Sequence, residues 1–420
     1  MSMLSAQQAE TLILDLVQPL DRQQDTEVLD LLAASGRILA DQVTSQLDFP
    51  HWDNSAMDGY AVRFEDVQAC SPEQPVVLEI VEEIPAGYQP QREILPGQTA
   101  RILTGSMMPV GADTVVIQEQ TQRAGDRVTI LAAPESPQAF VRHQAAFYQA
   151  GTPLLAAGLR LQAPEIAILA AAQCTQVTVY RRPRVAILST GSELVAPDQP
   201  LQPGQIVDSN QYALIALVAQ MGAEPIPLGI VPDHPEALHT AIAQAIATAD
   251  MVLSSGGVSV GDYDYVDQVL ADLGAEIHMR AVAVKPGKPL TVATFSGGSQ
   301  PQHPVLYFGL PGNPVSALVS FWRFVQPALR KLSGLPHGWE PKFVQGRSRQ
   351  SLRSDGKRET YLWGQLHLVE GLYEFDLAGG NRSSGNLINL AQTNGLAMIP
   401  AGQTLIATGQ PVQVLQVGSA

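Results

Sequence analysis

The stretch Met251-Val-Leu-Ser-Ser-Gly-Gly-Val-Ser-Val-Gly-Asp-Tyr-Asp264 contains the pattern that decides the fold. The short apolar run Met251–Leu253 predicts a buried strand, and the serines and glycines that follow it predict a turn. The segment from Asp264 to Leu273 is typical of a helix. A strand that leads through a turn into a helix is the repeating unit of α/β proteins with a parallel sheet.

The same alternation continues on both sides of this unit. Between residue 183 and about residue 330, strands are expected at Arg184–Leu188, Glu224–Ile230 and Val305–Phe308, and helices at Tyr212–Met221, Pro235–Ala249 and Val315–Leu332. Regular alternation of this kind predicts a doubly wound parallel sheet with helices on both faces. We assign this α/β domain to residues 179–330.

Further domains are expected around this sheet. Residues 5–40 are predicted to form two helices, because apolar residues recur there at helical spacing, and Pro164–Gln173 is predicted to form another. Between them, prolines and glycines separate short β-like runs. The expected organisation is a discontinuous helical linker domain (1–44 and 141–178), a β-rich insertion domain (45–140), the α/β domain (179–330) and a C-terminal β-barrel-like domain (331–420).

The charge balance restricts the ligands that this protein can bind. The chain of 420 residues has 25 Lys and Arg against 40 Asp and Glu, which gives a formal net charge of −15. This balance argues against nonspecific nucleic-acid binding, which requires a large basic surface. The protein as a whole repels an anionic ligand, so such a ligand needs local cations or a bound metal.

The cysteines and the apolar runs indicate the compartment. Cys70 and Cys174 form no C-x-x-C pair, so the sequence supports neither a disulfide scaffold nor a zinc knuckle, and free thiols fit a reducing cytosol. The stretch Met1–Leu20 lacks the pattern of a signal peptide. The longest apolar runs are far shorter than the roughly 20 residues that a membrane span requires. We therefore expect a cytoplasmic protein without a membrane segment.

Four polar clusters lie where ligands are expected, beyond the carboxyl ends of strands in a parallel sheet. They are Leu188–Glu193, Leu253–Asp264, Val284–Pro289 and Leu310–Ser316. Because the carboxyl ends of parallel strands meet at one edge of the sheet, these clusters are candidates for a single site.

The glycine-rich cluster is the main candidate for a phosphate site. Gly256 and Gly261 have phosphate-loop spacing, although Asp262 and Tyr263 stand where a Walker A motif has Lys and Ser or Thr. Backbone N–H groups of a glycine turn before a helix can still bind a phosphate; the candidates are Ser255, Gly256, Gly257, Ser259 and Gly261. The carboxylates of Asp262 and Asp264 would repel it unless a divalent cation bridged them, which favours metal-assisted binding. The alternative is an Asp-capped helix after a tight turn, with no ligand.

Two of the other clusters carry groups suited to an anion. Lys285-Pro-Gly-Lys288 holds two ammonium groups three residues apart on a stiff loop, although most lysines are only solvated surface residues. Asn313-Pro-Val-Ser316 is typical of a helix start, which either is purely structural or binds an anion. Glu193 and Asp233 are ordinary surface acids unless the fold brings them into one pocket.

Five motifs together resemble one known family. They are Asp53-Asn-Ser-Ala-Met-Asp-Gly-Tyr-Ala61, Thr190-Gly-Ser-Glu-Leu194, Ser254-Ser-Gly-Gly-Val-Ser-Val-Gly-Asp262, Lys285-Pro-Gly-Lys-Pro289 and Leu310-Pro-Gly-Asn-Pro-Val-Ser316. In this order they look like the molybdopterin molybdenumtransferases, the family of bacterial MoeA and the gephyrin E domain, and the resemblance spans about residues 5–400. It implies a four-part, L-shaped subunit, and a homodimer whose active cleft lies between the α/β domain of one subunit and the insertion of the other.

The resemblance also implies a reaction of molybdenum cofactor biosynthesis. Molybdate is inserted into the dithiolene of adenylylated molybdopterin, with Mg²⁺-dependent release of AMP, and the pathway partner is a molybdopterin adenylyltransferase. The charges agree with this implication. Pyrophosphate and molybdate are both anions, so an acidic protein needs Mg²⁺ on clustered carboxylates and the lysine loop to hold them.

Residue roles follow from the resemblance position by position. Catalytic roles are implied for Asp58, Thr104, Asp264, Lys285 and Lys288, a metal site for Glu193, Asp233 and Asp264, and substrate binding for Glu193, Ser316 and Ser384. A further arginine of the family matches ambiguously, at Arg358 or at Trp363, and we place it at Arg358 as a substrate-binding residue.

Two other functions stay open at this point. A molybdopterin adenylyltransferase of related fold would match residues 183–330 alone, and the motif Asp53–Ala61 and the C-terminal domain argue against it. A non-enzymatic scaffold, as in the gephyrin branch, would need a fused linker or partner domain, and the sequence shows neither.

Overall fold

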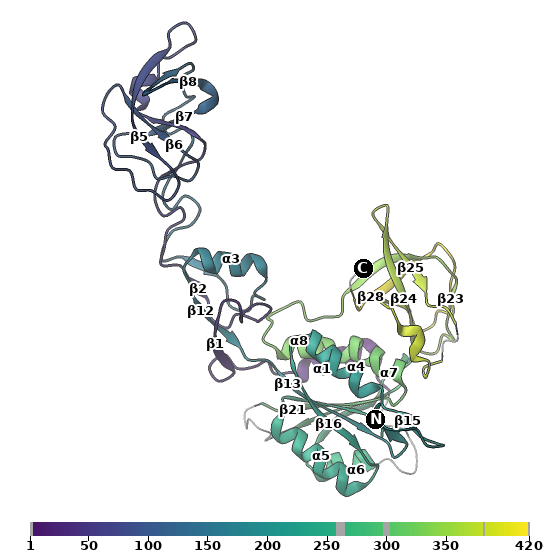
Figure 1. Cartoon of the computed structure of the whole chain (residues 1–420). Helices are drawn as coiled ribbons and strands as arrows, with labels where there is room; N and C mark the ends of the chain where they lie inside the picture. The colour runs from purple at the N-terminus through teal and green to yellow at the C-terminus, as the bar shows by residue number, and fades with distance from the viewer. Residues whose placement is uncertain (1–2, 258–264, 297–302, 381–382, 419–420) are drawn as a thin grey trace. The chain divides into compact units, whose positions relative to one another are not determined.

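The computed structural model describes residues 3–257, 265–296, 303–380 and 383–418. The chain divides into two compact units (Figure 1). The first unit comprises Met1–Asp41, Ala157–Ala163 and Gln176–Ala420, and the second comprises Gln42–Ala156 and Pro164–Thr175. The first unit contains the α/β domain and the C-terminal barrel, and the second unit is β-rich.

The α/β domain is built on a six-stranded sheet with the order β16-β13-β17-β21-β20-β18. Four strands are parallel, as the alternation of strands and helices predicts: β13 (Arg184–Thr190), β16 (Glu224–Val231), β17 (Met251–Ser255) and β21 (Val305–Leu310). The sheet departs from the predicted parallel arrangement at one strand, β20 (Pro289–Phe295), which is antiparallel to β21 and to the edge strand β18 (Glu276–Ala281). The connection between β18 and β20 is too short for the crossover that a parallel pair requires.

Helices cover both faces of this sheet, as predicted. One face carries α5 (Pro235–Thr248) and α6 (Tyr265–Asp272), and the other carries α1 (Ala6–Leu16), α4 (Asn210–Gln220), α7 (Pro314–Ser320) and α8 (Gln326–Leu332), with the π-helical turn Phe321–Val325 joining the last two (Figure 1). Side chains of β13 alternate between the two faces. Val185 and Ile187 belong to one core cluster and Ala186 and Leu188 to the other.

The prediction of two helices in residues 5–40 is only half correct. The first is α1, but the second segment contains the strand β1 (Thr26–Asp30), which pairs antiparallel with β12 (Gln176–Tyr180). Val28 is 60% exposed and Leu32 is 88% exposed, whereas Ile38 and Leu39 are buried, so the apolar residues that suggested a helix do not share one buried helical face. The pairing partner lies about 150 residues away in the sequence, where local periodicity carries no information about it.

The C-terminal part of the first unit is a closed barrel. Its strands are β22 (Phe343–Ser348), β24 (Glu359–Val369), β25 (Leu372–Leu377), β26 (Gly395–Ile399) and β28 (Pro411–Gln416). They follow the order β24-β25-β22-β28-β26, and β26 pairs back with β24 to close the ring. Shorter elements complete this unit: β14 (Leu194–Val195), β15 (Ile206–Val207), β19 (Val284–Lys285), β23 (Leu352–Arg353), β27 (Leu405–Ile406) and the 3₁₀ helix Leu387–Leu390.

One buried arginine ties the barrel to the helices of the α/β domain. Arg323 donates to Glu10 Oε2 at 2.6 Å and to the hydroxyl of Tyr361 at 2.7 Å. Glu10 lies on α1 and Tyr361 on barrel strand β24, and side chains of both elements share one core cluster with the sheet. This hydrogen-bonded arginine and the shared core therefore connect barrel strand β24 to the helices on the sheet.

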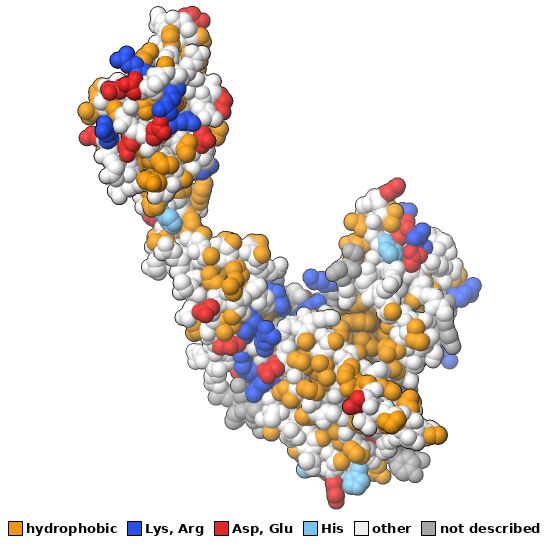
Figure 2. Space-filling model, viewed as in Figure 1, with side chains coloured by type: hydrophobic (Ala, Val, Ile, Leu, Met, Phe, Trp, Pro, Cys, Tyr) orange, Lys and Arg blue, Asp and Glu red, His pale blue; other side chains and the backbone are white. Residues whose placement is uncertain are grey.

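The second unit contains a six-stranded sheet with the order β7-β4-β6-β5-β9-β8. Its elements are β2 (Val43–Thr44), β3 (Asn54–Ser55), β4 (Gly59–Val62), α2 (Phe64–Val67), β5 (Val76–Ile84), β6 (Gln98–Ile102), β7 (Thr114–Ile117), the 3₁₀ helix Gln118–Gln120, β8 (Thr121–Ala124), β9 (Arg127–Ile130), β10 (Val141–Arg142), β11 (Pro153–Leu155) and most of α3 (Ala163–Ala171). Acidic and basic side chains are interspersed over the face of this unit seen in Figure 2. Among the described residues no helix is long and apolar enough to cross a bilayer.

Candidate active site

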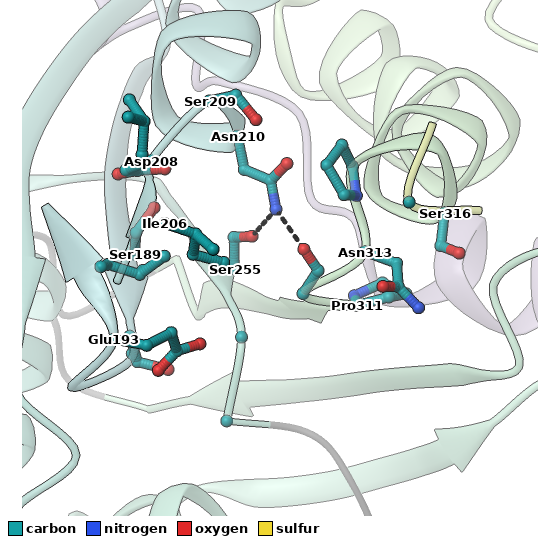
Figure 3. Close-up of a pocket in the computed structure, with 18 of the residues that line it drawn as sticks. Ser189, Glu193, Ile206, Asp208, Ser209, Asn210, Ser255, Pro311, Asn313 and Ser316 are labelled. Atoms are coloured by element: carbon teal, nitrogen blue, oxygen red, sulfur yellow. Dashed lines mark hydrogen bonds between the residues drawn. The ribbon is translucent and has the colours of Figure 1, made fainter. Parts of the chain in front are cut away.

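A pocket of about 670 Å³ opens where β13, β17 and β21 end (Figure 3). Three of the predicted clusters meet there, because the three strands are parallel. Predicted residues that line it are Glu193, Asp233, Ser255, Gly256, Gly257 and Ser316. Three further predicted residues, Ser259, Gly261 and Asp264, lie outside the described residues.

The turn after β17 accepts only glycine. Gly256 has φ +93°, and a Cβ there would lie 2.3 Å from the carbonyl oxygen of Thr190. Gly257 has φ +63°, and its Cβ would lie 2.7 Å from a methyl group of Val266. Both positions therefore need a residue without a side chain, for conformation and for space. The backbone can consequently lie at the pocket wall. The N–H of Gly256 donates to the carbonyl oxygen of Leu310 at 3.2 Å, so that group is not available to a ligand.

Replacing Gly256 by Ala is expected to lower the free energy of unfolding by roughly 1–3 kcal/mol, because the left-handed backbone and the contact with Thr190 both strain the variant. Gly274→Ala is the matched control. Gly274 has φ +81°, and a Cβ there would meet no atom within 4 Å. Denaturant unfolding of both variants measures the difference, and an equal loss for the two would contradict the close approach to Thr190.

Sequence reasoning missed Asn210, which connects two of the loops. Its Nδ2 donates to Ser255 Oγ at 2.6 Å and to the carbonyl oxygen of Gly312 at 2.8 Å (Figure 3). Asn210 begins α4, and the preceding Asp208 accepts from the backbone N–H of Gln211 at 3.2 Å. The only sequence signal for this role was Asp208-Ser-Asn210 at the start of α4. Such a sequence is typical of ordinary helix capping, so it does not indicate a link between two loops.

Two acidic side chains form one end of the pocket. Partial desolvation and the neighbouring negative charge of Glu193 raise the pKa of the Asp233 carboxyl above its ordinary value. Glu193 packs on the turn before it, since a Cβ on Gly191 would lie 2.8 Å from its carboxylate. Among the described residues no three His, Cys, Asp or Glu side chains gather as metal ligands. Two adjacent carboxylates nevertheless fit Mg²⁺, which keeps several waters and needs few protein ligands.

Removing the charge of Glu193 is expected to lower the pKa of Asp233. Like charges disfavour ionisation, so Asp233 takes up a proton at a higher pH than an isolated Asp, and Glu193→Gln should move this protonation to lower pH. The ¹³C carboxyl resonance of Asp233, followed by NMR against pH without metal, measures the shift. Glu236→Gln is the control, because Glu236 lies outside the pocket. An unchanged Asp233 titration in Glu193→Gln would show that the two carboxylates do not interact.

A second, basic pocket of about 320 Å³ joins the α/β domain to the barrel. Five residues predicted as anion-binding or substrate-binding residues lie along it: Lys285, Lys288, Ser316, Arg358 and Ser384. Arg358 donates to the carbonyl oxygen of Val284 at 3.0 Å, and the carbonyl oxygen of Ser384 accepts from the backbone N–H of Val315 at 3.1 Å. Pro289, Asn313 and Ser316 line both pockets, so the acidic and the basic pockets adjoin.

The lysine loop follows β18, a strand of the sheet, as predicted. Because β18 is antiparallel to β20 and β20 is antiparallel to β21, β18 runs in the direction of β21 and ends at the same sheet edge. Its first residues form β19, which pairs parallel with barrel strand β24, and the loop then leads into β20. Because β20 is antiparallel to β21, the start of β20 lies at the same sheet edge as the end of β21. The loop therefore arrives at the predicted edge.

Asp58 and Thr104 lie together in the second unit. The backbone N–H and the hydroxyl of Thr104 both donate to Asp58 Oδ1, each at 2.7 Å. These hydrogen bonds lower the pKa of Asp58, so its carboxylate is charged. Gly59 is also required here, since a Cβ would lie 2.0 Å from the carbonyl oxygen of Val116. The motif Asp53–Ala61 therefore presents an ionised carboxylate on a tightly packed strand.

Comparison with known proteins agrees with this architecture over nearly the whole chain. Family models match residues 4–172 (MoeA N-terminal region, domain I and II), 186–331 (probable molybdopterin binding domain) and 345–417 (MoeA C-terminal region, domain IV). A curated molybdopterin molybdenumtransferase of Nostoc sp. is 66% identical over 413 residues, which are 98% of this chain and 94% of the relative. One of Haemophilus influenzae is 36% identical over 345 residues, 82% of each chain. The MoeA crystal structure from Pyrococcus horikosii matches with a TM-score of 0.81 at 30% identity and covers 100% of both chains.

Glycine turns and paired acids at the carboxyl edge of a parallel sheet, beside a basic pocket, define an α/β protein suited to a phosphate-bearing ligand. The matches over all three regions then decide the family. This chain belongs to the MoeA family.

Proposed function

We propose that this protein is a molybdopterin molybdenumtransferase, which inserts molybdate into adenylylated molybdopterin and releases AMP in a Mg²⁺-dependent reaction. This proposal rests on one observation: the acidic pocket and the basic pocket lie next to each other. One offers a glycine turn and two carboxylates, and the other offers cations and hydroxyls. A pyrophosphate held through Mg²⁺ and a molybdate dianion need these two surroundings side by side.

In the first pocket, the glycine turn and the start of α7 are suited to the substrate's phosphates. Gly256 and Gly257 let the backbone of the turn approach the phosphates closely, with the Gly257 N–H as the candidate donor because that of Gly256 is bonded to Leu310, and the α7 N-terminus adds a positive dipole end. Glu193 and Asp233, with Asp264, would hold Mg²⁺, which would offset the charge of the phosphates during release of AMP. Ser255, Ser259 and Gly261 would complete the phosphate contacts.

In the second pocket, molybdate would lie among Lys285, Lys288, Ser316 and Ser384, with Arg358 from the barrel closing the site. The ammonium groups oppose the repulsion between molybdate and the nearby pyrophosphate. Lys285 Nζ donates to Asp355 Oδ2 at 2.9 Å, so part of its charge is already balanced. Among the described residues the Lys288 ammonium group makes no hydrogen bond or ion pair, which leaves its full charge for the ligand.

Asp58 and Thr104 enter this proposal through a homodimer. We infer that the insertion of one subunit completes the cleft of the other, so the charged Asp58 carboxylate would act on a substrate bound to the partner's α/β domain. The protein would work in the cytoplasm and receive its substrate from a molybdopterin adenylyltransferase. It needs neither nucleic acid nor a membrane for this role.

The test is a reaction with purified protein. We expect AMP to be released from adenylylated molybdopterin when molybdate and Mg²⁺ are present, and not when either is omitted. The alternative activity, adenylylation of molybdopterin, would instead consume ATP and yield pyrophosphate. Matches to the N-terminal and C-terminal regions as well as to the central domain favour the first reaction. Formation of adenylylated molybdopterin rather than its consumption would overturn the proposal.

A further inference from the structure

A small cleft on the first unit is lined largely by arginines. Four of its eleven lining residues are Arg37, Arg160, Arg181 and Arg182. None of the eleven is acidic, although the chain as a whole has 40 Asp and Glu against only 25 Lys and Arg. None of them lines the acidic or the basic pocket. We call this place the arginine cleft, and the function proposed above does not use it.

Two of the four arginines have acidic partners within the chain. Arg181 donates to Asp25 Oδ1 at 2.8 Å and to Asp250 Oδ2 at 2.7 Å. Burial opposes the charge of Arg181, but these two carboxylates raise its pKa above the ordinary value. Arg37 forms an ion pair with Glu27. The charges of Arg181 and Arg37 are therefore balanced without a ligand.

Arg160 and its neighbour Arg330 on α8 have no such partner. Both side chains are half-buried, and in the described part of the chain neither forms an ion pair. Arg160 donates to the carbonyl oxygen of Gly36 at 3.1 Å, and Arg330 to that of Glu340 at 3.4 Å. Burial lowers the pKa of both guanidinium groups, and the charge of Arg160 lowers the pKa of Arg330 further. Two like charges are thus held close together and partly out of water, which is unfavourable unless an anion balances them.

The chemistry and the size of the cleft indicate which anion fits. An arginine side chain keeps its charge at neutral pH and has five N–H donors, which match the oxygens of a phosphate group in pairs. The cleft has a volume of about 20 Å³, enough for about one water molecule. One oxygen of a phosphate can therefore enter it, while the other oxygens face the rim. Arg182 lies there, exposed and without an acidic partner among the residues that the structure describes.

We propose that the arginine cleft binds a phosphate group, which Arg160, Arg182 and Arg330 hold together. A phosphate group carries up to two negative charges, so a single ligand offsets the repulsion between Arg160 and Arg330. The same chemistry has two sources, free phosphate and a phosphomonoester such as AMP. The proposal does not depend on the reaction at the acidic and basic pockets.

The first experiment compares Arg160→Gln and Arg330→Gln with the unsubstituted full chain. Sodium phosphate is titrated by calorimetry at constant ionic strength, without Mg²⁺, molybdate or pterin. We expect each substitution to weaken phosphate binding about tenfold or more, as for loss of a hydrogen bond to a charged group. Arg347→Gln is the matched control, because Arg347 is exposed on β22 and lines neither the cleft nor the two pockets. It should bind phosphate like the unsubstituted protein.

NMR locates the bound phosphate. With ¹⁵N-labelled arginine, the Nε–H signals of Arg160, Arg330 and Arg347 are assigned by their loss in the three variants. Phosphate should shift the first two signals and leave that of Arg347 in place. Titration of AMP and of adenosine distinguishes the sources: a shift at lower concentrations of AMP than of phosphate indicates a phosphomonoester, the reverse order indicates free phosphate, and adenosine should cause no shift.

Thermal melting gives an independent measurement if Arg160→Gln fails to fold. Without phosphate and at low salt, Arg330→Gln should melt no lower than the unsubstituted protein, because it removes a charge that lacks a partner. Phosphate should raise the melting temperature of the unsubstituted protein more than that of Arg330→Gln. An equal rise in both proteins, or unchanged Arg160 and Arg330 signals at saturating phosphate, would overturn the inference. So would phosphate binding that is lost in Lys288→Ala and retained in both arginine variants, since the phosphate would then occupy only the basic pocket.

Discussion

Lys288→Ala is expected to weaken molybdate binding by about tenfold or more, while binding of adenylylated molybdopterin changes much less. A unit charge pair at about 4 Å is worth roughly 4 kcal/mol at an effective dielectric of 20, so one lysine strongly affects a dianion in a protein of net charge −15. Lys288 is the better choice than Lys285, whose charge is partly balanced by Asp355. Calorimetric titration of each ligand against both proteins measures the effect.

The control for this prediction is Lys342→Ala, which removes the same charge from an exposed lysine outside both pockets. It should leave molybdate binding nearly unchanged, since solvent and salt screen distant surface charges. If Lys288→Ala instead loses affinity for the pterin nucleotide and keeps its affinity for molybdate, the lysine loop belongs to the phosphates and the assignment of the basic pocket is wrong.

Mixing two inactive proteins, Asp58→Asn and Lys288→Ala, is expected to restore activity at up to about a quarter of the sites. Random exchange of subunits makes half of the dimers mixed, and each mixed dimer has one cleft without a substitution if the cleft is shared between subunits. Activity is measured as AMP release after subunit exchange has been verified by mass spectrometry. The effect is large, because each protein alone is expected to be inactive.

A mixture of Asp58→Asn with Thr104→Val is the control for this experiment. Both residues lie in the second unit and contact one another, so every cleft of a mixed dimer contains one of the two substitutions. No activity should return. Absence of rescue in the first mixture, despite verified exchange, would count against a cleft shared between subunits.

Much of the α/β domain could be predicted from the sequence alone. The strands β13, β16, β17 and β21 are short apolar runs, and the helices between them are long and periodic, so local pattern and tertiary packing agree. The order of parallel strands then brings their carboxyl ends to one edge, which explains why Glu193, Gly256 and Ser316 meet in one pocket. The family resemblance added further residues to the predicted site that no local sequence pattern identifies, such as Ser384.

Other features depended on contacts between distant parts of the chain. The strand β1 pairs with β12 across about 150 residues, and the antiparallel edge of the sheet follows from the short link between β18 and β20. Neither leaves a signal in the local spacing of apolar residues, because strand pairing is decided by the partner and not by the segment itself. The role of Asn210 also stayed hidden, since its partners, Ser255 and Gly312, come from two other loops.

The sequence by itself determined the α/β pattern, the glycines at the pocket and the family. Glycine is required where the backbone is left-handed or tightly packed, and such demands are local enough to be seen in a motif. Only the tertiary structure decided that the lysine loop pairs with barrel strand β24, and that this pairing places Arg358 and Trp363 beside Lys285 and Lys288. The reason is physical: charge and hydrogen-bond complementarity act through space between segments that are about 75 residues apart in the sequence.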